Sequence, residues 1–139
     1  MHIRTYHTLP QEALAVRIPV FVEEQGFVNE VDDIDTTIAT HLVLFDNDAP
    51  VGTCRIFPSD ADARYILGRL AVLKPYRGKQ CGQRLIAAAE DHVRTLGGKS
   101  ISLHSQCRAQ AFYEKCGYIA YGDIEDDEGC PHIWMKKEW

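Results

Sequence analysis

The segment with the clearest chemistry is a glycine-bearing loop between a strand-like run and a helix pattern. Leu70-Ala71-Val72 leads into Arg77-Gly-Lys-Gln-Cys-Gly82, and an amphipathic pattern starts at Gln83. Such a loop presents free backbone N–H groups at the positive end of a helix, which suits a phosphate or pyrophosphate. Arg77 and Lys79 add positive charge, and the glycines let the backbone approach a ligand closely. The loop therefore predicts phosphate binding.

Two common nucleotide-binding patterns do not describe this loop. The complete P-loop pattern G-x-x-x-x-G-K-[ST] and the dinucleotide pattern G-x-G-x-x-G are both absent from the chain. A general nucleotide-phosphate module, in which ATP or NAD would occupy the loop, is therefore the weaker hypothesis. A turn with a solvated basic edge is the structural alternative.

Composition excludes several other classes of function. Twenty acidic residues against fifteen Lys and Arg give a formal net charge of −5, which argues against a nucleic-acid partner. The five cysteines are irregularly spaced, without the paired spacing of a zinc site or a disulfide framework, so no metal is expected. Cys130-Pro-His132 has no second pair at ligand spacing.

No membrane partner is expected either. The chain has no apolar run near the roughly 18 residues that a spanning helix needs. Its first residues, Met1 to Tyr6, lack the apolar core of a signal peptide, so we expect a cytoplasmic protein.

The elements around the loop follow from periodicity and turn signals. The expected strands are residues 3–6, 40–45, 51–57, 64–73, 101–103, 118–124 and 132–136. The expected helices are residues 8–18, 83–96 and 109–116. Thr8 and Gln11 suggest a capping box, Pro19 should kink or end the first helix, and residues 21–37 should form a broken helix and loop. With 139 residues, this order predicts one mixed α/β (α+β) domain over residues 1–139.

At this point the sequence resembles a known family. Arg77-Gly-Lys-Gln-Cys-Gly82 resembles the pyrophosphate-binding loop of the GNAT N-acetyltransferase superfamily, in particular its small stand-alone bacterial members. Ala109-Gln-Ala-Phe-Tyr-Glu-Lys-Cys-Gly-Tyr118 resembles the A-x-x-F-Y-x-x-x-G-F/Y segment of that superfamily. The chain departs from the pattern at Gln80, where the loop usually has Gly, and at Gln106, where Asn is common. The resemblance covers essentially the whole chain and implies a central, mixed, mostly antiparallel sheet flanked by helices.

The resemblance also implies an activity and a cosubstrate. It implies an acetyl-CoA-dependent N-acetyltransferase that passes the acetyl group directly to the amine of a small molecule in a ternary complex. The implied cosubstrate contacts are Leu70, Ala71, Val72, Arg77, Gly78, Lys79, Gln80, Cys81, Gly82, Gln83 and Gln106. A catalytically silent CoA-binding regulatory or interaction module of the same fold is the alternative.

Two side chains are the implied catalytic groups. Tyr113 occupies the family position of the acid that assists the leaving thiolate. His132, which begins the last strand, is the first choice for the base, and Glu23 and Glu24 are the alternatives. If they are not catalytic, Tyr113 is a core aromatic residue beside Phe112 and His132 is a histidine packed against the neighbouring strand.

The sequence leaves the acceptor open between two chemistries. Acidic residues within 23–35 and 125–128 could admit a cationic amine, whereas Arg17, Arg55 and Arg69 could grip a carboxylate or phosphonate. A homodimer through an exposed strand edge is also left open.

Overall fold

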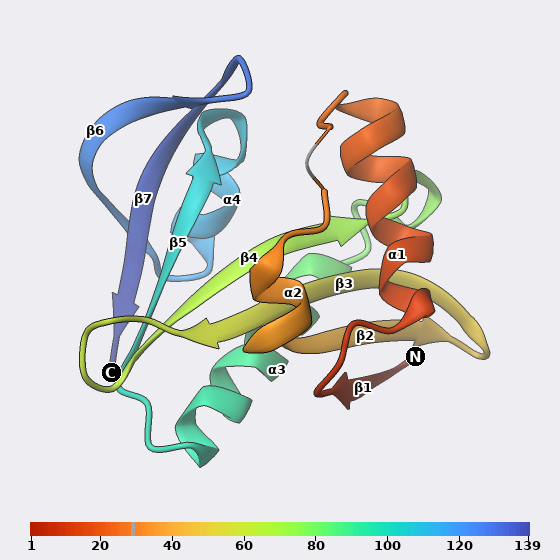
Figure 1. The fold of residues 1–139 in the computed structure, drawn as a ribbon, viewed down its shortest axis with the longest axis horizontal. Helices are drawn as coiled ribbons and strands as arrows, with labels where there is room; N and C mark the ends of the chain where they lie inside the picture. The colour runs from red at the N-terminus through yellow and green to blue at the C-terminus, as the bar shows by residue number, and fades with distance from the viewer. Residues whose placement is uncertain (29) are drawn as a thin grey trace.

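A seven-stranded sheet runs through the molecule in the computed structural model, which describes residues 1–28 and 30–139 (Figure 1). Its strands are β1 (His2–Tyr6), β2 (Thr40–Asp46), β3 (Ala49–Pro58), β4 (Arg64–Val72), β5 (Ser100–Gln106), β6 (Ile119–Asp127) and β7 (Cys130–Glu138). Their order across the sheet is β1-β2-β3-β4-β5-β7-β6. Only the β4–β5 pair is parallel, so the expected mixed, mostly antiparallel sheet is confirmed.

Helices cover both faces of the sheet. They are α1 (Gln11–Arg17), the π-helix η1 (Ile18–Glu24), α2 (Asp33–Thr37), the 3-10 helix η2 (Lys74–Tyr76), α3 (Cys81–Thr95), the 3-10 helix η3 (Cys107–Ala109) and α4 (Gln110–Lys115). α1 and α2 lie over one face and α3 over the other (Figure 1). Within the described residues no helix is long and apolar enough to cross a bilayer.

Strand β2 shows how the two helical layers share one sheet. Leu42 and Leu44 pack into the core cluster that contains Leu85 of α3, whereas Val43 and Phe45 pack with Ala13 of α1. Successive strand residues point to opposite faces, so a continuous apolar run is what a strand covered on both sides needs.

The start of the first helix differs from the expectation. α1 begins at Gln11, its N-cap is Pro10 in an extended conformation, and no side chain caps it, so the predicted Thr8 capping box is wrong. Pro10 has an extended ψ of 155°, which keeps it outside the helix. The expectation for Pro19 is confirmed, because the α-helical turns end at Arg17 and a π-helix follows.

The most important feature for function is the parting of β4 and β5. These strands pair only from Arg64–Leu67 with Ser100–Leu103. On the other side of β4, Arg55 of β3 pairs with Gly68 and Thr53 pairs with Ala71, so two β4 residues bulge opposite one. The bulge includes Arg69, whose φ is +52°. Beyond it β4 and β5 separate, and β5 continues to Gln106, further than the predicted strand 101–103.

Candidate active site

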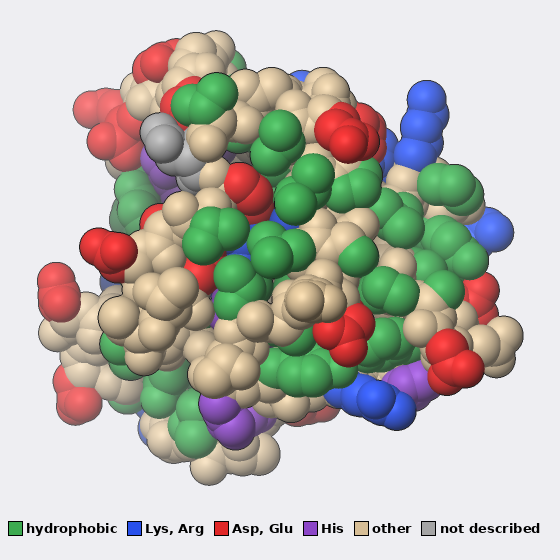
Figure 2. All heavy atoms as spheres, turned by 45° about the vertical axis from the view of Figure 1, so that its right-hand side comes forward, with side chains coloured by type: hydrophobic (Ala, Val, Ile, Leu, Met, Phe, Trp, Pro, Cys, Tyr) green, Lys and Arg blue, Asp and Glu red, His purple; other side chains and the backbone are tan. Residues whose placement is uncertain are grey.

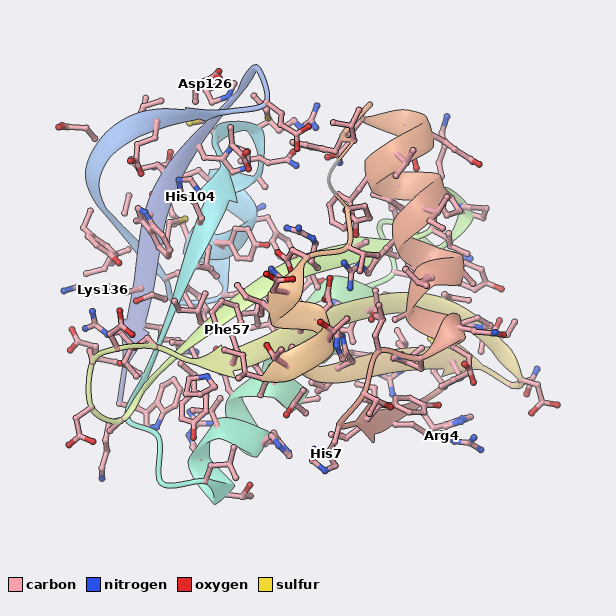
Figure 3. All side chains as sticks on the ribbon, in the orientation of Figure 1. Arg4, His7, Phe57, His104, Asp126 and Lys136 are labelled. Atoms are coloured by element: carbon pink, nitrogen blue, oxygen red, sulfur yellow. The ribbon has the colours of Figure 1, made fainter. Side chains whose placement is uncertain are left out.

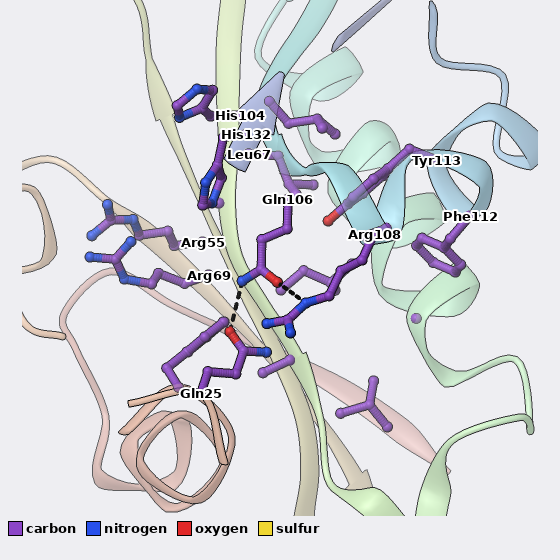
Figure 4. Close-up of a pocket in the computed structure, with 18 of the residues that line it drawn as sticks. Gln25, Arg55, Leu67, Arg69, His104, Gln106, Arg108, Phe112, Tyr113 and His132 are labelled. Atoms are coloured by element: carbon purple, nitrogen blue, oxygen red, sulfur yellow. Dashed lines mark hydrogen bonds between the residues drawn. The ribbon is translucent and has the colours of Figure 1, made fainter. Parts of the chain in front are cut away.

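A cavity of about 970 Å³ lies where β4 and β5 separate (Figure 4). Its walls come from η1, β3, β4, the β4–α3 loop, β5, α4 and β7. Most of the residues expected from the sequence line it, namely Leu70, Ala71, Val72, Arg77, Gly78, Gln80, Cys81, Gly82, Gln83, Gln106, Tyr113 and His132. Lys79 does not line it, and its Nζ lies 5.5 Å from the centre of the Tyr76 ring instead.

The β4–α3 loop reaches the cavity in a conformation rich in left-handed residues. Gly78 has φ +76° and Gln80, the N-cap of α3, has φ +64°. The first N–H groups of a helix have no intrahelical acceptor, and no side chain caps α3. These donors are therefore left for an anionic ligand. Gly82 has a packing role, since a Cβ there would lie 2.9 Å from Cζ of Phe112.

Arg77 ties this loop to the first helical layer. Its Nη1 and Nη2 donate to the two carboxylate oxygens of Glu24 at 3.0 and 2.8 Å, and its Nε donates to the Val72 carbonyl at 2.9 Å. The hydrogen bond from Arg77 lowers the pKa of Glu24. Glu24 is thus held as a carboxylate outside the cavity lining, and Glu23 is exposed and also outside it.

Tyr113 lies on α4 with its ring almost entirely buried. Its ring packs edge-on against Phe112 and Tyr118, with centroids 5.1 and 6.2 Å away. Its hydroxyl points toward the side of the cavity where Gln106 lies (Figure 4), and no hydrogen bond to it occurs among the described residues. Burial raises the pKa of Tyr113 well above that of an ordinary tyrosine, so the hydroxyl keeps its proton.

The register of β5 and β7 brings two histidines together. Gln106 is opposite His132 and His104 is opposite Trp134, so alternate residues of both strands face the cavity. His132 is 6% exposed, and its Nδ1 lies 2.8 Å from the Cys130 carbonyl. A carbonyl only accepts hydrogen bonds, so Nδ1 carries the proton and Nε2 has a lone pair.

Sequence reasoning missed His104. Its ring lies 4.8 Å from that of His132 and stacks on Trp134, also at 4.8 Å. Nε2 of His104 lies 3.4 Å from Glu125 Oε1, below the hairpin tip that carries Asp126 (Figure 3). Burial and the neighbouring His132 lower the pKa of His104, which favours its neutral form. The available signal was the two-residue spacing of polar and aromatic side chains on two paired strands.

Two hydrogen-bonded bridges cross the cavity mouth. Gln106 Nε2 donates to Gln25 Oε1 at 2.7 Å, and Arg108 Nε donates to Gln106 Oε1 at 2.7 Å (Figure 4). The backbone N–H of Val28 donates to Glu128 Oε1 at 3.2 Å, which joins the β6–β7 hairpin to the chain after η1. These contacts join the first helical layer to the β5–β7 side across the cavity.

A closed set of ion pairs lies beside the cavity. Three arginines and three carboxylates alternate in it, and each member pairs with two of the opposite charge. We call it the arginine–carboxylate ring, and its members are Arg17, Glu30, Arg69, Asp32, Arg55 and Asp35. Figure 4 shows the side chains of Arg55 and Arg69 extending side by side. The arginines expected to grip a substrate carboxylate are thus already paired, and Arg17 does not line the cavity.

Most buried atoms of the ring are paired, but the buried Nε of Arg55 has no hydrogen-bond partner among the described residues. Arg17 Nη2 lies 2.8 Å from Asp35 Oδ2, and Arg55 Nη1 lies 2.7 Å from Asp32 Oδ1 and 2.9 Å from Asp35 Oδ1. Burial would raise the pKa of Asp35, but the hydrogen bonds and charges of Arg17 and Arg55 outweigh it and hold that pKa well below its usual range. For Glu30 burial prevails and the pKa is raised.

The acidic side chains on the outer surface agree with the net charge of −5. On the face seen in Figure 2, hydrophobic side chains gather over the middle and acidic groups are spread around them. Among residues 1–28 and 30–139, no cluster of His, Cys, Asp and Glu could hold a metal ion.

Comparisons with known proteins agree with this geometry. A family model described as "Acetyltransferase (GNAT) domain" matches residues 8–139. The uncharacterized protein YyaT of Bacillus subtilis is 35% identical over 131 residues, which cover 91% of this chain and 87% of YyaT. Protein ElaA of Escherichia coli is 33% identical over 129 residues, which cover 90% of this chain and 84% of ElaA.

Solved structures of other proteins share this fold. The crystal structure of Escherichia coli ElaA superposes with a TM-score of 0.86 at 29% identity and covers 99% of both chains. An aminoglycoside 6'-N-acetyltransferase complexed with coenzyme A shares the fold, with a TM-score of 0.80 at 19% identity over 99% of this chain and 97% of that one. With the family model spanning nearly the whole chain and relatives above 30% identity, the protein belongs to the GNAT acetyltransferase family.

Proposed function

We propose that the protein transfers the acetyl group of acetyl-CoA directly to the amine of a small molecule, with both substrates bound together. The observation that carries the proposal is the continuity of one cavity, which extends from the β4–α3 loop to Tyr113 and His132. A nucleophile and an acyl donor that enter from opposite ends of one cavity react without a covalent enzyme intermediate, and proximity supplies much of the rate.

The loop fits the diphosphate of CoA. The uncapped N-terminus of α3 offers backbone donors and the positive end of a helix of 15 residues. Gly78 has no atom within 4 Å of an ideal Cβ position, so the backbone there is open to a ligand. Beyond Leu67 the edge of β4 no longer pairs with β5, so Leu70, Ala71 and Val72 can pair with the pantetheine arm as an added strand would.

Tyr113 is assigned to the leaving group. When the amine nitrogen attacks the thioester carbon, the carbon–sulfur bond breaks and negative charge collects on sulfur. A buried tyrosine with a raised pKa remains protonated, so its hydroxyl can donate a hydrogen bond to this sulfur. The absence of a competing acceptor for this hydroxyl among the described residues supports the role.

His132 is assigned to the amine. An ammonium group, with an ordinary pKa of about 10.4, must lose a proton before it can attack. The Cys130 carbonyl fixes the proton on Nδ1, so Nε2 can accept the proton of the substrate. His104 packs beside the His132 ring, and Trp134 packs on His104. Because the lowered pKa of His104 favours its neutral form, no positive charge from His104 opposes the proton that His132 accepts.

The test is acetyl transfer measured as thiol release from acetyl-CoA with a panel of small amines, alongside calorimetry of acetyl-CoA binding. We expect Tyr113→Phe to lower kcat by about 10- to 100-fold while acetyl-CoA binds as before. His132→Gln should lower kcat/KM by about 100-fold or more, because a positioned general base contributes about that much, while acetyl-CoA binds as before. Tyr121→Phe and His92→Gln are matched controls, because neither residue lines the cavity. Binding of acetyl-CoA without transfer to any amine would contradict the proposal.

A further inference from the structure

One part of the cavity is suited to the acceptor. We define it by six of the residues that line the cavity, namely Phe27, Phe57, Arg69, Glu128, His132 and Trp134. We call this part the acceptor chamber. Its charges decide which amine fits, because a group that leaves water must find a partner of opposite charge.

The arginines of the ring that face the chamber are already paired with carboxylates. Arg55 and Arg69 belong to the arginine–carboxylate ring, in which three guanidinium groups meet three carboxylates. Arg77 is paired with Glu24, whereas Arg108 forms no ion pair among the described residues and donates its Nε to Gln106 Oε1 beside the Gln25–Gln106 bridge. A substrate carboxylate could therefore pair with Arg55 or Arg69 only by displacing a carboxylate of the ring.

The carboxylates of the β6–β7 hairpin are in the opposite situation. Asp127 and Glu128 line the cavity, and none of the ion pairs between described residues joins either of them to a lysine or arginine. Glu128 Oε1 accepts the Val28 N–H, which fixes its position without cancelling its charge. Glu125 faces His104, whose neutral form also leaves that carboxylate uncompensated. The hairpin side of the chamber is therefore negative.

The remaining walls are aromatic and hold several unengaged polar atoms, among them the buried Nε of Arg55 and the buried Nε2 of His104. Phe27, Phe57 and Trp134 supply apolar surface, and the side chain of His132 is more than nine-tenths buried. Nδ1 of His132 is bonded to Cys130, but its Nε2 has no hydrogen bond among the described residues. This acceptor within the cavity lining can take one N–H of a ligand.

The register of the β6–β7 hairpin sets the separation between His132 and Asp127. Glu125 is opposite His132 and Asp127 is opposite Cys130, so Asp127 lies two residues along the strand from the histidine. Two residues of strand rise about 7 Å. A four-carbon chain between two nitrogens nearly covers that span.

We propose that the acceptor carries a second cationic group and no carboxylate, with its reacting nitrogen at His132 and its remote cation at Asp127 and Glu128. This substrate class rests on the proposed function and narrows it. The aromatic walls contact the apolar chain between the two nitrogens, and the ring keeps the charges of Arg55 and Arg69 paired with carboxylates.

Calorimetry with three probes of equal chain length tests the charge preference. The probes are 1,4-diaminobutane, butylamine and 4-aminobutanoate, measured with and without CoA at low ionic strength. We expect 1,4-diaminobutane to bind about tenfold more tightly than butylamine, and 4-aminobutanoate to bind least. Equal binding of the three, tighter binding of 4-aminobutanoate, or no binding of 1,4-diaminobutane would overturn the proposal. Because binding does not require turnover, a failure of acetyl transfer would count only against the proposed function.

Paired variants locate the effect. Asp127→Asn with Glu128→Gln should reduce the preference for 1,4-diaminobutane over butylamine to about twofold, and the amide oxygen introduced at position 128 can still accept from Val28. The control is Asp123→Asn with Glu114→Gln, which removes two exposed carboxylates outside the cavity and changes the net charge equally. An equal loss in the control would assign the effect to net charge and contradict the proposal.

Discussion

Replacing Asp35 by Asn tests the arginine–carboxylate ring most directly. Asp35 is 2% exposed and accepts from Arg17 Nη1 and Nη2 at 2.9 and 2.8 Å. It also lies 2.9 Å from Arg55 Nη1, and its Oδ2 accepts the Asp32 N–H at 3.1 Å in the capping box of α2. Asparagine has nearly the same shape, so the change removes charge without creating a cavity.

The expected loss follows from what the variant leaves behind. The ring changes from three positive and three negative groups to an excess of one positive charge, beside an Arg17 side chain that is 1% exposed. Removing one partner of a buried ion pair costs about 3–5 kcal/mol of the free energy of unfolding. At about 3 °C per kcal/mol for a chain of this size, the midpoint temperature should fall by about 9–15 °C.

Urea denaturation followed by tryptophan fluorescence measures this loss. Asp33→Asn is the control, since Asp33 is exposed on the same helix and should cost less than about 1 kcal/mol. The double variant Arg17→Gln with Asp35→Asn restores neutrality and should be less unstable than the sum of its single changes. If Asp35→Asn stayed within about 1 kcal/mol of the unaltered protein, the ring would not be a buried, mutually dependent unit.

The same variant has a pH signature. The pKa of Asp35 is lowered in the folded protein, so its stabilising contribution is complete above the unfolded value, about 3.9, and is lost as the pH falls toward the folded value. The stability difference between the unaltered protein and Asp35→Asn should therefore narrow below about pH 4. A difference that persists unchanged at low pH would contradict an electrostatic origin.

Three other changes test separate features. Gln80→Gly should stabilise the fold by about 0.5–1 kcal/mol in urea denaturation, because φ is +64° there, whereas Gln83→Gly within α3 should destabilise it. His41→Gln should flatten the pH dependence of stability below about pH 6.5. Burial lowers the pKa of His41 in the folded protein, so the unfolded chain binds the proton first and the free energy of unfolding decreases as the pH falls. Glu90→Gln should cost about 2–4 kcal/mol, because buried Glu90 accepts from Tyr118 Oη at 2.9 Å and from Lys137 Nζ at 3.1 Å. An unchanged unfolding midpoint would refute the prediction for Gln80→Gly or for Glu90→Gln. An unchanged pH profile of stability would refute the prediction for His41→Gln.

The parts that could be predicted from sequence are those governed by nearby residues. The buried positions Leu85, Ile86, Ala89 and Val93 recur at helical spacing, and Gly97 at φ +83° ends that helix, so local pattern and conformation agree. The motif around Gly82 likewise lies within one strand–loop–helix unit. Residues that are close in the chain come into contact through local structure alone, so their contacts can be predicted without knowing the rest of the fold.

The parts that could not be predicted depend on long-range registers. Arg17, Glu30 and Arg69 are far apart in the chain, and nothing in their spacing indicates that they form ion pairs with one another. The environment of His104 depends on the pairing of β5 with β7, where a shift of one residue would turn the ring to the other face. Charge alone suggested substrate-binding arginines, and only the packing of α1 and α2 against β3 and β4 shows them already paired.

The ring also explains how β4 can leave β5 and still pair with β3. Arg69 adopts φ +52°, a conformation that costs a residue with a side chain about 1 kcal/mol or more. Its guanidinium lies 3.6 Å from Glu30 and 3.4 Å from Asp32, so contacts with the segment between η1 and α2 hold the bulge. Well-packed apolar residues would often be as stable as buried ion pairs. Arginine has the reach to join strands β3 and β4 to the helical layer above them, and this pairing leaves the charges of Arg55 and Arg69 balanced where they line the cavity.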